Sequence, residues 1–310
     1  MRAVTIAKTG GLDVLEVKDR TVRAAGHGEV RIAVKAAAVN PTDILVREHG
    51  AGPGIPPPWI PGMDAAGVIE SVGAGVERLR VGEEVMATTT PRRPEGGAQI
   101  ELLVVPAASV VAIPTGATLA QASTLPMNGL TALLGLELLG FAPGQTLAVS
   151  GGAGWLAYLV IVLAKLRGLR VLADAKPEEV ELVRSYGADV VVARGERFCE
   201  AIRAEVPAGV DGLFDTALLL HAGFPAIRDG GVIVPVRGWD GSATERGIEV
   251  RAVMVSEALE RTAWLEELRE LASSGRIKLR VAGEYPVERV ADAQRAMAAG
   301  GLRGRAVLVF

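Results

Sequence analysis

Residues 147–157 read LAVSGGAGWLA, an apolar run that ends in closely spaced glycines and continues into a second apolar stretch. The run before the glycines predicts a strand over 145–151, and the segment 155–168, which ends at Gly168, predicts a helix. Gly152, Gly154 and Ala157 have the spacing G-x-G-x-x-A within the turn between them. A strand, a glycine-rich turn and a helix in this order are typical of a sheet that binds phosphates at its edge.

Each small residue of this turn has its own task in a dinucleotide site. The first glycine permits the tight turn, the second leaves room for a diphosphate, and the third position packs the helix on the strand. The N–H groups that open the helix then face the phosphates. The predicted coenzyme-binding residues are Gly152, Ala153, Gly154, Trp155, Leu156 and Ala157.

The triplet alone fits an ordinary strand–helix turn equally well, because the chain contains 38 glycines. Asp174, at the end of the next predicted strand, favours the coenzyme site, since an acid there accepts hydrogen bonds from ribose hydroxyls. Trp155 occupies a variable position and leaves two interpretations open. Its ring either packs beneath the turn or crowds the coenzyme.

The chain changes character along its length. Short apolar segments at 29–40, 65–76, 82–90 and 97–106 alternate with glycine and proline turns, which predicts a β-barrel or sandwich. From 145 onward strands and helices alternate, which predicts a parallel sheet covered on both faces. We expect 248–255 to be the last strand of that sheet, and the closing RAVLVF to return to the first domain.

Composition excludes several classes of function. A chain of 310 residues predicts two domains, and a net charge of −3 without charged blocks argues against nucleic acid or a membrane surface as partner. Cys199 is the single cysteine, so neither a disulfide within the chain nor a thiolate zinc site is expected. The apolar stretch 155–163 is far shorter than the ~20 residues of a membrane span. We therefore expect a cytoplasmic protein.

Six segments in order resemble one family across essentially the whole chain: 36–50, 60–85, 97–114, 122–133, 151–168 and the closing LRGRAVLVF. They are similar to the medium-chain dehydrogenases/reductases, in the zinc-free quinone oxidoreductase branch that includes zeta-crystallin. The resemblance implies an α/β protein with a GroES-like β-barrel catalytic domain (1–119 with 256–310), a Rossmann doubly wound parallel-sheet domain (120–255) and a cleft that holds nicotinamide.

The chain departs from the zinc branch of that family at the catalytic ligands. Where the zinc enzymes place Cys, His-Glu and a further Cys or Asp, this chain has Asn40, Met63-Asp64 and Met127. Amide and thioether groups do not form a zinc site, and the cysteine-rich structural loop is missing as well. We expect no metal, although a zinc enzyme with altered ligands remains an alternative.

The resemblance also implies roles for several polar residues. Thr131 would contact the nicotinamide ring, Thr42 would relay a proton, and Asn40, with Asn128 as a second donor, would stabilise a developing oxyanion. Asp64 is a further candidate, and His49 would protonate an enolate. Structural alternatives stay open: Asn40 ends a strand, Thr42 caps the helix after it, Asp64 makes structural hydrogen bonds, and His49 is a surface histidine.

The family resemblance and the residues of this chain favour different coenzymes. The family mostly uses NADPH, whereas Asp174 would repel a 2′-phosphate and suits the bare ribose of NADH. Lys176 and Arg194 still offer positive charge nearby. We expect NADH or NADPH, with the residues favouring NADH.

The predicted function is a zinc-independent NAD(P)H-dependent reductase that transfers hydride to a quinone or an α,β-unsaturated carbonyl. One alternative is a dinucleotide-binding sensor or structural protein with little activity. Another is an enoyl reductase or a tailoring reductase for polyketide-type metabolites. An apolar strand at the sheet edge predicts a homodimer, since such edges are usually covered.

Overall fold

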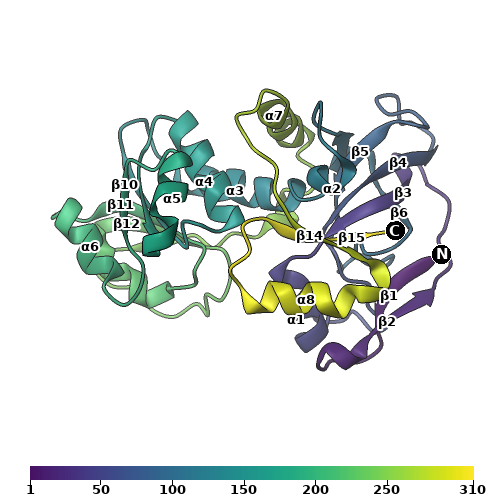
Figure 1. Ribbon diagram of the computed structural model, residues 1–310, viewed down its shortest axis with the longest axis horizontal. Helices are drawn as coiled ribbons and strands as arrows, with labels where there is room; N and C mark the ends of the chain where they lie inside the picture. The colour runs from purple at the N-terminus through teal and green to yellow at the C-terminus, as the bar shows by residue number, and fades with distance from the viewer. The chain divides into compact units, whose positions relative to one another are not determined.

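The computed structural model describes residues 1–310, and Figure 1 labels many of its helices and strands. Contacts divide the chain into two compact units. Unit 1 comprises Met1–Met127 and Leu259–Phe310, and unit 2 comprises Asn128–Ala258. From the sequence, we expected the boundaries between the two domains at 119/120 and 255/256.

Unit 2 is built on a six-stranded sheet whose strands are all parallel. The strand order is β10-β9-β8-β11-β12-β13, so the order reverses between β8 and β11. The strands are β8 (Thr146–Ser150), β9 (Arg170–Ala175), β10 (Val190–Ala193), β11 (Val210–Asp215), β12 (Ile227–Pro235) and β13 (Glu249–Val250). This doubly wound order confirms the predicted sheet, and sheets of this kind generally bind ligands at the reversal, here between β8 and β11.

Continuous burial along the central strands shows that both faces of this sheet are covered, since successive side chains point to opposite faces. Helix α4 (Trp155–Leu166) packs against β8 and β9, α5 (Val180–Ser185) against β9 and β10, and α6 (Phe198–Glu205) against β10. Helix α3 (Pro126–Leu139) begins at Pro126, where a proline is tolerated because the first helical N–H has no partner within the helix.

The predicted strand over 248–255 was wrong in length, because β13 is only Glu249–Val250. The Arg251 side chain bonds elsewhere: its Nη1 donates to the carbonyl of Leu138 near the end of α3, at 2.6 Å, and its Nη2 pairs with Glu249. No further strand pairs with the outer side of β13. Beyond Val250 the backbone still follows β12, because the Arg251 and Val253 N–H groups donate to the carbonyls of Ile233 and Pro235 at 2.9 and 3.1 Å, but it forms no regular strand.

Unit 1 contains a seven-stranded sheet and a two-stranded ribbon. Its order is β14-β15-β3-β4-β5-β7, with β6 also paired to β3, and β1 pairs with β2. The strands are β1 (Arg2–Ile6), β2 (Leu15–Asp19), β3 (Glu29–Ala38), β4 (Asp64–Val72), β5 (Glu84–Thr88), β6 (Leu102–Pro106), β7 (Val110–Ala112), β14 (Val281–Pro286) and β15 (Arg305–Val309). The helices are α1 (Pro41–His49), α2 (Leu119–Ala122), α7 (Thr262–Ser273) and α8 (Val290–Ala299).

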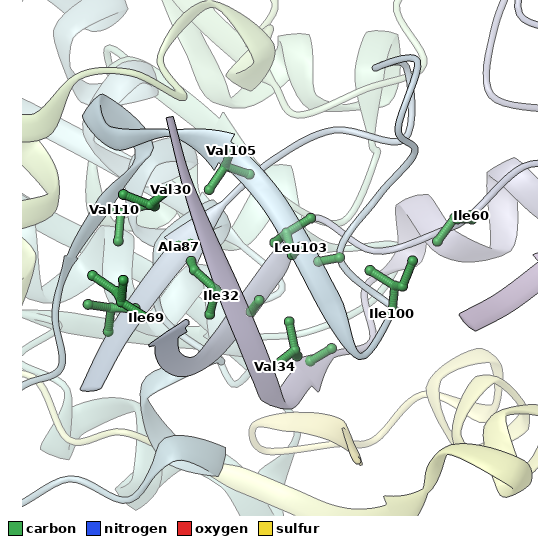
Figure 2. Packing of buried hydrophobic residues seen from close by; sticks show 14 of the residues in the cluster. Val30, Ile32, Val34, Ile60, Ile69, Ala87, Ile100, Leu103, Val105 and Val110 are labelled. Atoms are coloured by element: carbon green, nitrogen blue, oxygen red, sulfur yellow. The ribbon is translucent and has the colours of Figure 1, made fainter. Parts of the chain in front are cut away.

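The period of two along β3 explains the core of unit 1. Val30, Ile32 and Val34 are buried on one face and contact apolar side chains from the neighbouring strands, among them Ile69 and Leu103 (Figure 2). The final strand β15 pairs antiparallel with β3, Val307 lying opposite Ala38. This pairing confirms the predicted return of the chain end to the first domain.

Candidate active site

The glycine turn of unit 2 lies directly after β8, at the reversal of strand order. Gly151 carries the positive φ of +70° that the turn requires, so the left-handed residue is the one before the predicted first glycine. Gly152 is needed for a different reason: a Cβ there would lie 2.4 Å from the carbonyl oxygen of Asp174 on β9. The Gly154 N–H closes the turn on the Gly151 carbonyl at 2.8 Å.

Gly154 leaves open space at the start of α4. It occupies the N-cap position with an ordinary φ of −71°, and a Cβ there would meet only the Gly151 carbonyl oxygen, at 3.1 Å. Ala157, one turn into the helix, is fully buried. No acidic residue lies in the first turn of α4, so the N–H groups that open the helix face no carboxylate from the helix itself. This turn fits a dinucleotide diphosphate.

Trp155 is buried at the first position of α4. Its ring stacks on Tyr158, with centroids 5.4 Å apart, and Tyr158 in turn contacts Tyr186 edge to face at 4.7 Å. Only 2% of Trp155 is exposed. The buried ring corresponds to the first of the two interpretations given for Trp155, in which the indole packs beneath the turn.

Asp174 is buried next to the glycine turn. Its Oδ1 accepts the Gly152 N–H at 2.9 Å, and its Oδ2 lies 3.6 Å from Nε of Arg194. Burial raises the pKa of Asp174, while the Gly152 N–H and the Arg194 guanidinium act in the opposite direction. The structure thus brings Asp174 together with the glycine turn and with Arg194. Lys176, in contrast, is exposed just beyond β9.

Backbone strain lies at the end of the neighbouring strand β11. Leu218 and Leu220 adopt positive φ values of 62° and 52°, which are unusual for leucine. The Asp215 carboxylate holds the segment by accepting from Ser150 Oγ at 2.7 Å and from the Leu220 N–H at 2.8 Å. A fixed conformation next to the glycine turn is typical of ligand-binding edges.

A second group of polar side chains is buried within unit 1. Asn40, the N-cap residue of α1, donates from Nδ2 to Asp64 Oδ2 at 2.7 Å and accepts at Oδ1 from Arg305 Nε at 2.8 Å. The other oxygen of Asp64 accepts the Met127 N–H at 2.6 Å. We call Asn40, Asp43, Asp64, Gln99 and Arg305 the polar cluster.

Asp43 anchors the start of α1 to this cluster. Its carboxylate accepts the backbone N–H groups of Asn40 and Gly62, at 2.7 and 2.8 Å, and Nε2 of Gln99 at 3.1 Å. Asp43, Asp64 and Asn40 are all 0% exposed. The side chain that caps α1 from within is therefore Asp43, and Thr42 does not cap the helix.

Burial raises the pKa of both Asp43 and Asp64 to about 7, because desolvation outweighs their hydrogen bonds and the attraction of Arg305. The same burial lowers the pKa of Arg305 to about 10. The guanidinium thus remains charged at neutral pH, while the two carboxyls titrate around neutrality and influence each other. The cluster is a buried acid–base system with one permanent cation.

The cluster is a poor fit for zinc. Asn40 and Asp64 are bonded to each other, Met127 contributes a backbone N–H, and the Arg305 cation contacts Asn40 directly. A divalent cation there would face the guanidinium charge and an amide in place of a thiolate. No group of three or more His, Cys, Asp or Glu side chains is arranged to hold a metal ion.

The remaining predicted catalytic residues lie in different surroundings. Thr42, at the second position of α1, has a buried Oγ1 without a hydrogen-bond partner. His49 is exposed at the end of α1. In α3, Asn128 and Thr131 are buried at positions i and i+3, on one face of the helix.

The sequence analysis did not identify Asp43, Gln99 and Arg305. The available signal for Arg305 was a charged residue at the start of an apolar strand, RAVLV. Its partner Asn40 is 265 residues away, and no local pattern connects the two.

The raised pKa of Asp64 has a consequence for stability. The unfolded chain releases this proton near pH 4 and the folded chain retains it to about pH 7, so ionisation destabilises the fold across that range. We expect wild type to lose stability relative to Asp64→Asn, which cannot ionise, as pH rises from about 4 to about 7. Urea unfolding of both proteins at several pH values measures the difference. A constant difference would contradict the raised pKa.

Two family descriptions match the chain: alcohol dehydrogenase GroES-like domain over residues 26–115, and zinc-binding dehydrogenase over 186–308. The chain is 33% identical to the chloroplastic NADPH-dependent alkenal/one oxidoreductase of Arabidopsis thaliana, covering 94% of this chain and 75% of that protein. It is 27% identical to the quinone oxidoreductase of Mus musculus, with 100% and 98% covered.

A crystal structure of an NAD-dependent alcohol dehydrogenase superposes with a TM-score of 0.87 at 28% identity, with both chains fully covered. No helix of the structure is both long and apolar enough to cross a membrane. The matches extend through both units and agree with the GroES-like and Rossmann assignment. The chain belongs to the medium-chain dehydrogenase/reductase superfamily, in the quinone oxidoreductase-like branch of its nicotinamide-dependent oxidoreductases.

Proposed function

We propose that the chain is a zinc-independent NAD(P)H-dependent reductase of quinones or α,β-unsaturated carbonyls. The observation that carries the proposal is the glycine turn after β8, which presents an uncovered Gly154 and the start of α4 at the reversal of strand order. The names of the relatives, an alkenal/one oxidoreductase and a quinone oxidoreductase, support the substrate class.

The bound nicotinamide would supply the hydride, and the protein residues supply placement, charge and a proton path. Gly152, Gly154 and the first N–H groups of α4 would hold the diphosphate, and Asp174 would accept from the ribose. Thr131, with Asn128 on the same face of α3, would contact the nicotinamide side of the coenzyme.

Within unit 1, the geometry favours Thr42 for the polar contact with the substrate. Its Oγ1 is buried and has no hydrogen-bond partner, so the hydroxyl is available to donate to a carbonyl oxygen as charge develops there. Asn40 is held by Asp64 and Arg305, which fixes the orientation of its amide. In this proposal the polar cluster positions Asn40 at the start of α1, and exposed His49 is a surface residue.

The test is coenzyme oxidation with 1,4-benzoquinone and with a crotonyl-type enone, after treatment with a chelator. We expect turnover that survives the chelator, and we expect Thr42→Val to lower kcat by about 10–100-fold while coenzyme affinity stays unchanged, since only a contact made during reaction is lost. Thr42→Ser should restore most of the activity. Tight coenzyme binding without oxidation above background would instead favour the sensor or structural protein.

For the coenzyme, we propose NADH as the better substrate, with Arg194 allowing NADPH as well. Asp174 suits a ribose diol, while the guanidinium 3.6 Å away offers a partner for a 2′-phosphate. The relatives support both choices, since one is named NADPH-dependent and another NAD-dependent. Arg194→Ala should raise KM for NADPH and leave KM for NADH nearly unchanged.

A homodimer through the β13 edge and a cytoplasmic location remain predictions. The edge strand is short, but Met254 just beyond it is 47% exposed, as expected for a surface that a second copy covers. Light scattering at micromolar concentration should give twice the mass of the chain. A monomer there would contradict the dimer.

A further inference from the structure

Unit 1 has a concave site, to which the polar cluster contributes no side chain. Residues 54–60 and 91–96 form its walls, together with Arg20 just after β2. Its volume of about 480 Å³ lies within the range of small-molecule sites. Arg20 also lines two smaller adjoining hollows, so it stands where all three meet. We call this site the arginine pocket.

The apolar wall of the arginine pocket is held in place by backbone contacts. Trp59 exchanges backbone hydrogen bonds of 2.9 Å with Ile6, and its indole Nε1 donates to the Ile55 carbonyl at 2.9 Å. Ile60 belongs to the barrel core and lies at one end of it, near Ile100 (Figure 2). A Cβ on Gly96 would come within 2.7 Å of Ile60, so the second wall packs closely on the first. The pocket is therefore formed before any ligand enters.

The charges of the arginine pocket are mostly unneutralised. The guanidinium groups of Arg20 and Arg92 are exposed and make no hydrogen bond or ion pair. Arg93 has a buried Nε without a hydrogen-bond partner, 3.7 Å from Glu95 Oε2. Glu95 is the single acid of the lining, and its Oε1 already accepts from Arg23 at 2.8 Å. Arg93 also lies 3.5 Å from Glu29 through its Nη2, so its charge is paired, and the guanidinium groups of Arg20 and Arg92 are the two that lack a partner.

We propose that the arginine pocket binds a small organic phosphate, with its phosphate between Arg20 and Arg92 and its apolar body against Trp59 and Ile60. Guanidinium groups match the oxygens of phosphate with paired N–H donors. A phosphate monoester carries close to two negative charges at neutral pH and can satisfy two arginines, whereas a carboxylate carries one.

The test is titration calorimetry at low salt with phenyl phosphate, benzoate and inorganic phosphate. We expect phenyl phosphate to bind more tightly than either of the others, because it alone combines two charges with an apolar body. Arg20→Ala and Arg92→Ala should each weaken it by about tenfold, and the double variant should abolish binding. Arg276→Ala, an exposed arginine of unit 1 without partners, is the matched control and should bind like wild type.

The outcomes separate this site from the coenzyme site. Unchanged melting temperatures and unchanged coenzyme oxidation in the arginine variants would show that only the pocket was altered. Loss of phenyl phosphate binding on saturation with NADH, or equal affinity in the double variant, would assign the anion to the glycine turn and overturn the proposal. Equal binding of benzoate would overturn the phosphate assignment, and equal binding of inorganic phosphate would overturn the role of the apolar wall.

Discussion

Replacing Arg305 with leucine is expected to lower the free energy of unfolding by about 3–5 kcal/mol well above pH 7, because it leaves buried carboxylates without their cation. The side chain is buried on β15, and its Nε bonds to Asn40, which in turn bonds to Asp64. Without the guanidinium, Asp43 and Asp64 lose the attraction that opposes the rise in their pKa values. The cost should be measured by urea unfolding.

The same variant has a distinctive pH dependence. Well below pH 7 the two carboxyls are protonated in the fold, so less negative charge remains uncompensated when Arg305 is absent. The destabilisation should therefore grow as pH rises above about 7 and shrink as pH falls back through that value, and Arg276→Leu on the surface should cost little at any pH. A loss below about 1 kcal/mol, or one independent of pH, would contradict the buried ion cluster.

The second large effect concerns the glycine turn, where two neighbouring glycines have different tasks. Gly154→Ala should fold with at most a small loss of stability, since its φ of −71° suits alanine and the one tight contact of the new methyl is with the Gly151 carbonyl oxygen at 3.1 Å. The methyl occupies the space that a diphosphate needs, so we expect Kd for the coenzyme to rise at least about tenfold. Gly152→Ala should instead lower the melting temperature, because its methyl would clash with the Asp174 carbonyl.

This pair of variants distinguishes binding from folding. Circular dichroism melting reports the fold, and titration with NADH and NADPH reports the site. If Gly154→Ala bound both coenzymes as wild type does, the diphosphate would not lie on this turn.

Local patterns predicted most of the fold. The period of two along β3 and the strand–turn–helix around Gly152 and Gly154 depend on neighbouring residues, so the sequence alone can predict them. The wrong strand over 248–255 shows the limit: apolar content permits a strand, but regular pairing with β12 covers only two residues, and the hydrogen bonds that continue from Arg251 and Val253 do not extend it as a strand. The sequence also assigned the tight turn to Gly152, whereas the residue with positive φ is Gly151. The G-x-G-x-x-A spacing identifies the turn but not which residue adopts the left-handed conformation.

The candidate site was less accessible to sequence reasoning. Asn40 and Asp64 could be singled out by resemblance, whereas the contact between them and the role of Arg305 depend on pairing of β15 with β3 across the chain. Asp43 looked like an ordinary helix residue, because its three N–H donors come from separate segments of unit 1. Buried polar networks of this kind are assembled by tertiary structure and leave little local signal.

Titration calorimetry of the wild-type protein with NADH and NADPH tests the central claim most directly. We expect one molecule of coenzyme to bind per chain with a micromolar dissociation constant, and NADH to bind at least as tightly as NADPH. If neither coenzyme bound even at millimolar concentration, the glycine turn would be an ordinary connection between β8 and α4, and the reductase proposal would fail with it.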